Sequence, residues 1–210
     1  MSDTLDIASQ IGGARNGDFA ALGKLLQRYR AYLSVLARTQ MDGRLRQRVS
    51  PSDVVQETML KAHRGFGDFR GVTERELLVW LRQILVNNLA AYVERHLIAA
   101  KRDVRREVSI DRIGAALEKS TIQLAAIVPA DWNTPSRCAQ HREESVLLAD
   151  RMAALPADYR EVLILRNLQG LPFSRVAESM NRTEGAVRML WLRAIERLRH
   201  AYGEESDDEQ

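Results

Sequence analysis

Residues 172–198 read PFSRVAESMNRTEGAVRMLWLRAIERL, and this stretch decides the architecture of the C-terminal part of the chain. Two helical patterns are separated by Asn181, a residue type that tolerates the positive φ of a tight turn. Thr183 follows as the predicted N-cap of the second helix. The pattern therefore predicts a helix-turn-helix, with Ala177 as the small residue where the two helices meet. Its inward-facing residues are Val176, Ala177, Met180, Val187, Leu190 and Ile195.

The outer face of this motif is polar and basic, as expected of a helix that enters a DNA major groove. The alternative is a plain helical hairpin with a solvated basic face. Residues 151–202 carry nine Arg, no Lys and five acidic residues, and this balance favours DNA binding. The candidate DNA-contacting residues of the motif are Arg175, Thr183, Glu184, Arg188, Met189 and Arg193.

The composition is that of a soluble globular protein. The chain has 210 residues, of which 45% are hydrophobic and 28% are charged. It has no apolar run near the ~20 residues of a membrane helix and no visible signal peptide, so we expect a cytoplasmic protein without membrane insertion. A single cysteine, Cys138, cannot form an internal disulfide or supply a cysteine-based zinc site.

Charge is distributed unevenly along the chain. The last eight residues, 203–210, contain five acids and no base, so the remaining 31 basic and 23 acidic side chains give the body a net charge of +8. Arg accounts for 27 of these bases, and its planar fork suits phosphate and base edges. A GC-rich genome that favours Arg codons explains this usage equally well. The basic body points first to nucleic acid as a partner.

The N-terminal part predicts a compact all-α unit over residues 10–100. A helix is expected over 18–40 with Asp18 as N-cap, and another from Pro51 with Ser50 and Asp53 as a capping box. GFGDFRG, residues 65–71, reads as a loop. Thr73 and Glu76 form a capping box for a helix over 74–98. The apolar stripe of the first helix is Leu22, Leu25, Leu26, Tyr29, Leu33 and Leu36.

Residues 101–145 differ from the rest in their charge density and prolines, and predict a linker with one short helix. The helical pattern returns near Glu144, restarts after Pro156 and ends at Gly170. The predicted fold class is all-α, with two small helical domains at 10–100 and 146–202, a charged linker at 101–145 and an acidic tail at 203–210.

Features of an enzyme are missing from the sequence. It contains no glycine-rich phosphate loop, no HExxH and no nucleophile elbow. The histidines are scattered and are expected at the surface, and Cys138 is expected to be incidental. We therefore expect a protein that is not an enzyme and binds no cofactor or metal. The four histidines are His63, His96, His141 and His200.

Two long segments together resemble a known family. DVVQETMLKAHRGFGDFRG (residues 53–71) and ELLVWLRQILVNNLAAYVERH (residues 76–96) resemble region 2 of the sigma-70 family of bacterial RNA polymerase initiation factors, in its extracytoplasmic-function (ECF) branch. ALPADYREVLILRNLQGLPFSRVAESMNRTEGAVRMLWLRAIERLR (residues 154–199) resembles region 4. The resemblance covers roughly residues 15–100 and 145–200. It implies a sigma factor that binds core polymerase and directs promoter recognition and DNA melting.

The resemblance assigns a docking role to one face of the helix that begins at Pro51. In the family this face binds the clamp coiled coil of the polymerase β′ subunit, and the polymerase β flap is a second expected contact. Without the resemblance, an ordinary solvated face in which Glu57 pairs with Lys61 is the simpler interpretation. The candidate polymerase-binding residues are Asp53, Gln56, Glu57 and Leu60.

The resemblance also assigns the 65–71 loop and the following helix to the −10 promoter element, and the helix-turn-helix to the −35 element. Trp80 and Tyr92 fit a buried stripe at least as well as a stacking role. A basic run of Arg95, His96, Lys101, Arg102, Arg105 and Arg106 is expected to follow phosphates. The candidate −10 residues are Phe69, Arg70, Arg82, Asn87, Asn88 and Arg95.

Other functions remain open at this point. A helix-turn-helix transcription regulator with an N-terminal sensing or dimerisation domain would have a similar C-terminal half. A helical adaptor that does not bind DNA is a further alternative, which the Arg188 and Arg193 face disfavours. Promoter DNA and core polymerase are the expected partners, and an anti-sigma factor is left open as a third.

Overall fold

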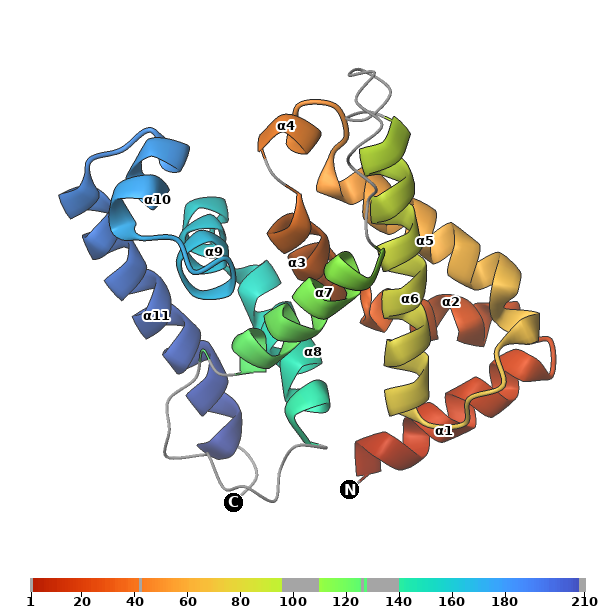
Figure 1. The fold of residues 1–210 in the computed structure, drawn as a ribbon. Coiled ribbons are helices and arrows are strands. Elements are labelled where there is room, and N and C mark those ends of the chain that lie inside the picture. The colour runs from red at the N-terminus through yellow and green to blue at the C-terminus, as the bar shows by residue number, and fades with distance from the viewer. Residues whose placement is uncertain (1, 42, 96–109, 126, 128–139, 208–210) are drawn as a thin grey trace. The chain divides into compact units, whose positions relative to one another are not determined.

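A computed structural model describes residues 2–41, 43–95, 110–125, 127 and 140–207. These residues form helices and connecting turns, with no strand among them, which confirms the predicted all-α class (Figure 1). The chain divides into two compact units, Met1–Leu117 and Glu118–Gln210. Helix α7 (Ile110–Ala125) crosses this boundary and occupies part of the segment that the sequence predicts as a linker.

The first unit is built around helices α5 and α6, which lie side by side in Figure 1. Helix α3 packs against both of them, and α1 packs mainly against α2. The elements of this unit are α1 (Ser2–Arg15), α2 (Phe19–Arg28), α3 (Arg30–Gln40), α4 (Gly43–Arg46), α5 (Pro51–Gly65), the 3₁₀ turn η1 (Phe66–Asp68) and α6 (Glu74–Val93).

The core of the first unit follows the predicted apolar pattern. All six residues of the stripe predicted over 18–40 are buried, and α6 adds Leu77, Leu81 and Leu85. Helix α1, which the sequence pattern did not predict, also contributes to the core, because Ile7 and Ile11 are each only 1% exposed. The core therefore extends further toward the N-terminus than the predicted unit.

The predicted helix starts are confirmed. The Asp18 side chain accepts a hydrogen bond from the Ala21 N–H at 2.9 Å. Ser50 caps α5 and Thr73 caps α6, each in a reciprocal capping box with the residue three positions later. These boxes satisfy backbone N–H groups that have no partner within the helix. Local sequence therefore determines where α2, α5 and α6 begin.

The single helix predicted over 18–40 is wrong, because the chain breaks at Tyr29 into α2 and α3. Tyr29 has φ −93° and ψ 2°, outside ideal helical geometry. Its side chain is fully buried, and its hydroxyl donates to Glu74 Oε1 at 2.9 Å. The 74–98 helix is described only as far as Arg95. This break accompanies a contact across 45 residues, which periodicity within the segment does not reveal.

The second unit contains the helix-turn-helix. Asn181 adopts the left-handed conformation (φ 52°, ψ 49°), and Gly170 has φ +69° after the preceding helical segment, both as predicted. Helix α11 packs against α8, α9 and α10. Its elements are α8 (Gln140–Ala154), α9 (Ala157–Leu163), a π-helical turn η5 (Ile164–Leu168), α10 (Phe173–Met180) and α11 (Glu184–Asp207).

Three of the six predicted inner residues of the motif are buried, and Met180, Leu190 and Ile195 are half-buried. Val176 and Val187 are completely buried, and Ala177 is 7% exposed. Two buried residues of α11, Ala194 and Leu198, were not among the predicted inner residues. The buried face of α11 thus extends to Leu198, three residues beyond the last predicted inner residue, Ile195.

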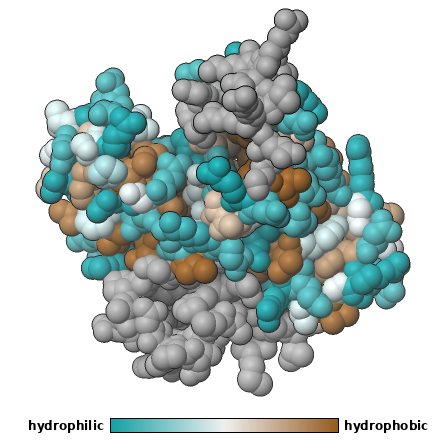
Figure 2. All heavy atoms as spheres, viewed as in Figure 1, coloured by the Kyte–Doolittle hydropathy of each residue, from teal (hydrophilic) through white to brown (hydrophobic). Residues whose placement is uncertain are grey.

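The surface mixes polar and apolar residues. On the face drawn in Figure 2, hydrophilic residues alternate with hydrophobic ones over the described part of the chain. Within that part, no helix is both long and apolar enough to cross a membrane.

Candidate functional site

The predicted polymerase-binding residues lie on one face of α5 and are open to solvent. Their spacing at positions i, i+3, i+4 and i+7 places them on adjacent turns of the same side. Asp53 and Gln56 are exposed, Glu57 is half-buried, and Leu60 is 51% exposed. The opposite side of the helix is buried in the unit, through Val54, Val55, Thr58 and Ala62. We call Asp53, Gln56, Glu57 and Leu60 the α5 face.

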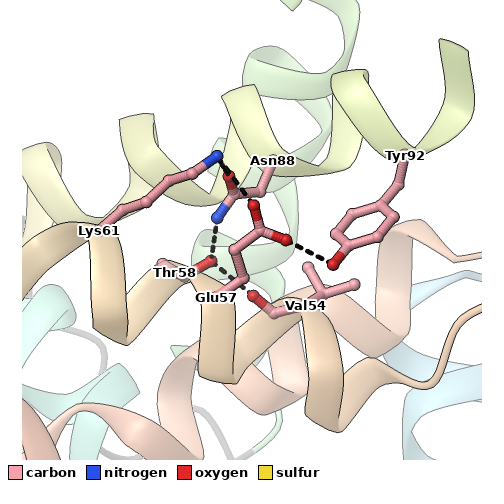
Figure 3. A network of polar contacts seen from close by, with 6 residues as sticks. All are labelled: Val54, Glu57, Thr58, Lys61, Asn88 and Tyr92. Carbon is pink, nitrogen blue, oxygen red and sulfur yellow. Dashed lines mark hydrogen bonds and ion pairs between the residues drawn. The ribbon is translucent and has the colours of Figure 1, made fainter. Parts of the chain in front are cut away.

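The two carboxylates of the α5 face also have structural contacts. The Asp53 carboxylate accepts a hydrogen bond from the Ser50 N–H at 3.4 Å as part of the capping box. Glu57 Oε1 lies 3.0 Å from Lys61 Nζ, so the ion pair of the simpler interpretation is present. Glu57 Oε2 accepts a hydrogen bond from the Tyr92 hydroxyl of α6 (Figure 3). Bonds from Tyr92 and Lys61 lower the Glu57 pKa, so this carboxylate stays charged at neutral pH.

Three of the predicted −10 residues are buried in the first unit, so their role at the −10 element stays a prediction. Phe69 is 5%, Arg82 8% and Asn88 1% exposed. The Phe69 ring packs against the rings of Phe66 and Trp80, at centroid distances of 5.6 and 5.0 Å. The Asn88 amide donates to Thr58 Oγ1 at 2.9 Å. In this structure these side chains contribute to the packing of the unit.

The other three predicted −10 residues, Arg70, Asn87 and Arg95, are exposed. Asn87 Oδ1 accepts a hydrogen bond from Gln83 Nε2 at 3.1 Å, and the Arg95 guanidinium lies 5.8 Å from the centre of the Tyr92 ring. The rest of the predicted basic run lies outside the described residues: His96, Lys101, Arg102, Arg105 and Arg106. Cys138 and the last three residues of the acidic tail also lie outside them.

The loop that carries Arg70 is held from both sides. Arg15 of α1 donates through Nη2 to the carbonyl oxygens of Phe69, at 3.2 Å, and of Gly71. On the other side, Glu76 Oε2 accepts hydrogen bonds from the Val72 N–H at 2.9 Å and the Thr73 N–H at 3.0 Å. Sequence reasoning missed Arg15, because 54 residues separate it from Phe69 and no local pattern links them. These contacts constrain the backbone on which Arg70 is presented.

The six predicted −35 residues are all exposed in the second unit. Thr183 Oγ1 accepts a hydrogen bond from the Ala186 N–H at 3.3 Å, so Thr183 caps α11 as predicted. Arg175 pairs with Glu178 at 2.6 Å, and Arg188 pairs with Glu184 one turn earlier. Met189 is 51% exposed. The outer face of α11 is therefore accessible over its first three turns.

An aromatic cluster supports this face and was also missed from the sequence. The Phe173 ring lies edge-on to Trp191, at a centroid distance of 5.7 Å. The guanidinium groups of Arg166 and Arg188 lie 4.6 and 5.0 Å from the centre of the same ring. Trp191 Nε1 also donates to Asn167 Oδ1 at 2.9 Å. Arg188 is thus oriented by Glu184, one turn earlier, and by Phe173, whose contact helical periodicity does not reveal.

We expect an added methyl group to destabilise the 65–71 loop at Gly71 but not at Gly67. A Cβ at Gly71 would lie 2.4 Å from Phe69 Cζ and 2.7 Å from Glu76 Cβ, whereas a Cβ at Gly67 meets nothing within 4 Å. Gly71→Ala should therefore destabilise the protein by about 1–3 kcal/mol through overpacking. Gly67→Ala is the matched control. Urea unfolding of both variants measures the difference, and equal stabilities would contradict the tight packing at Gly71.

Comparison with known proteins agrees with this architecture. The family model described as "Sigma-70, region 4" matches residues 145–198, which contain the helix-turn-helix. The ECF RNA polymerase sigma-E factor of Haemophilus influenzae is 28% identical over 201 residues, covering 94% of this chain and 96% of the relative.

Two further relatives extend the similarity over most of the chain. The ECF RNA polymerase sigma-E factor of Escherichia coli is 29% identical over 202 residues, covering 94% of this chain and 95% of the relative. The RNA polymerase sigma-H factor of Pseudomonas aeruginosa is 28% identical over 185 residues, covering 88% and 87%. With the helix-turn-helix of the second unit and the matching region 4 model, these similarities over most of the chain support an RNA polymerase sigma factor of the ECF branch of the sigma-70 family.

Proposed function

We propose that the chain binds core RNA polymerase through the α5 face and directs it to promoters by contacting the −10 element with its first domain and the −35 element with its second. The observation that carries the proposal is the solvent exposure of two different surfaces. The α5 face is acidic with one exposed leucine, and the α11 face is rich in Arg. One surface suits a protein partner and the other suits DNA.

The α5 face has the chemistry of a protein interface. Leu60, whose side chain is 51% exposed, follows the acidic and amide groups of the face by about one turn. An exposed apolar residue next to charged and amide groups is a common feature of a protein-binding surface. The two carboxylates favour a basic partner, and the clamp coiled coil of the β′ subunit is the proposed one. The β flap is the proposed partner of the second domain.

For the −10 side we propose Arg70, Asn87 and Arg95 as the contact residues. Their side chains are exposed, whereas Phe69, Arg82 and Asn88 are buried and serve the fold. Guanidinium and amide groups can hydrogen-bond the edges of unstacked bases and contact the phosphates of a melted strand. Binding to the open strand would favour DNA melting, because it stabilises the separated state.

For the −35 side we propose the outer face of α11, which begins at its Thr183 cap. Residues near the start of a recognition helix are placed to reach base edges in the major groove. Arg188 lies in the second turn, and Arg193 lies five residues later on a different side. Arg188 is the proposed base-reading residue, and Arg193 the proposed phosphate contact. In this role the chain binds and positions, and it carries out no bond chemistry of its own.

Runoff transcription with purified core polymerase on a library of promoter sequences tests the function as a whole. We expect promoter-specific transcripts only when the protein is added, and weak promoter binding by the protein alone. The reason is that two small DNA-facing domains gain avidity only when polymerase holds them at a suitable separation. Tight, specific DNA binding without polymerase would instead support a helix-turn-helix regulator, and transcription that does not depend on the protein would overturn the proposal.

A charge placed in the α5 face tests the docking surface. Leu60→Arg should weaken binding to core polymerase at least tenfold, because it removes an apolar contact and adds a positive charge facing a basic partner. Val79→Arg on α6 is the matched control, since Val79 is 48% and Leu60 51% exposed. Neither substitution removes a residue of the capping box or a contact partner of Glu57. A pull-down titration measures both, and equal weakening by the two variants would argue against docking at this face.

Alanine substitutions of single arginines on α11 test the division of roles in DNA binding. Arg188→Ala should cost about 1–3 kcal/mol and relax the preference at one base pair of the −35 element. Arg193→Ala should weaken binding to all sequences alike and reduce its salt dependence. Transcription by holoenzyme from single-base promoter variants measures both effects. If Arg188→Ala weakens every promoter by the same factor, Arg188 is a phosphate contact and not a base-reading residue.

A further inference from the structure

A chain of polar contacts joins α5 and α6 and includes Glu57 of the α5 face (Figure 3). The Tyr92 hydroxyl donates to Glu57 Oε2, and Lys61 Nζ contacts both Glu57 Oε1 at 3.0 Å and Asn88 Oδ1 at 2.5 Å. The Asn88 amide then donates to Thr58 Oγ1 at 2.9 Å, and the Thr58 hydroxyl donates to the Val54 carbonyl at 2.8 Å. Each side chain of the set thus contacts the next, from α6 to the backbone of α5.

These contacts hold the Glu57 carboxylate in one orientation. Tyr92 donates to one carboxylate oxygen and Lys61 to the other, so two of about four lone-pair positions are occupied. The remaining positions are available to a partner, because the Glu57 side chain is still 36% exposed. A free surface glutamate loses rotamer freedom when it binds a partner. Here that freedom is already restricted in the unbound protein.

Lys61 is itself oriented from the buried side. Asn88 is 1% and Thr58 0% exposed, so the amide that contacts Lys61 is held by a buried hydrogen bond. Tyr92 lies on the other side of Glu57 and approaches from α6, and the Arg95 guanidinium lies over its ring. The hydrogen bond to Glu57 is the first cause of a Tyr92 pKa raised to about 12, so the phenol keeps its proton at neutral pH and remains a donor.

We propose that Tyr92 is a positioning residue for polymerase docking: its hydroxyl orients the Glu57 carboxylate toward the partner without touching the partner itself. This inference rests on the proposed function, in which the α5 face binds core polymerase. It assigns Tyr92, which the sequence suggests as a buried or stacking residue, a role in protein binding. A hydroxyl that only joins two helices would contribute to stability and leave binding unchanged.

A double-mutant cycle on the full chain separates these two roles. Tyr92→Phe keeps the ring and removes only the hydroxyl, and Glu57→Ala removes its acceptor. We expect Tyr92→Phe to weaken binding to core polymerase about three- to tenfold in the parent chain. In the Glu57→Ala background the same change should alter the affinity less than about twofold, because the group through which Tyr92 acts is gone.

Tyr29→Phe is the matched control for stability. Tyr29 also donates its hydroxyl to a glutamate of α6, Glu74 Oε1, but it is buried away from the α5 face. We expect this variant to lower the midpoint of urea unfolding without changing the affinity for polymerase. Equal effects of Tyr92→Phe in the two backgrounds, or equal weakening by Tyr29→Phe, would overturn the positioning role.

The same measurements distinguish failure of the inference from failure of the docking proposal. If Leu60→Arg weakens polymerase binding but Tyr92→Phe does not, the α5 face remains the docking surface and the role of Tyr92 is wrong. If neither Leu60→Arg nor Glu57→Ala changes the affinity, the docking surface is wrong and the inference fails with it.

Discussion

The packing of α5 against α6 is the contact on which the first unit depends most. It buries the apolar sides of both helices, and at its centre the buried Asn88 amide donates to the buried Thr58 hydroxyl. A polar pair in such a place is tolerated because each group has a partner, and it favours one alignment of the two helices over others. That alignment brings Tyr92 next to Glu57 and leaves Leu60 in solvent. The accessible α5 face is therefore a consequence of how α6 packs beneath it.

The ends of these helices are determined more locally. Ser50 and Thr73 cap the starts of α5 and α6 in capping boxes. The connection between the two helices runs from Phe66 to Thr73. Phe69 turns inward against Trp80, while the next residue, Arg70, stays in solvent. Arg15 and Glu76 bond to the backbone on either side of it. One inward aromatic residue and one outward basic residue thus give the loop a buried side and a solvent-exposed side, and the proposed −10 contact Arg70 lies on the exposed side.

In the second unit, contacts with neighbouring side chains orient the long arginine side chains on the surface. Exposed ion pairs contribute little to stability, so the pairs of Arg188 with Glu184 and of Arg175 with Glu178 matter mainly for orientation. The Phe173 ring adds a flat surface beneath Arg188. Because Glu184 already occupies part of the Arg188 fork, the bidentate contact to a base proposed above requires this pair to rearrange or to be shared with DNA.

The sequence by itself determined the all-α class, the helix starts at Asp18, Ser50 and Thr73, and the left-handed turn at Asn181. These features depend on residues within four positions of one another, so local patterns reveal them. It also identified the exposed faces of α5 and α11, because helical periodicity separates inner from outer positions. Only the tertiary structure decided the break at Tyr29, the burial of Phe69, Arg82 and Asn88, and the contacts of Arg15 and Tyr92. The hydrogen bonds of Tyr29, Asn88, Tyr92 and Arg15 join residues 27 to 56 positions apart, where the packing of whole helices, and not local preference, brings the partners together.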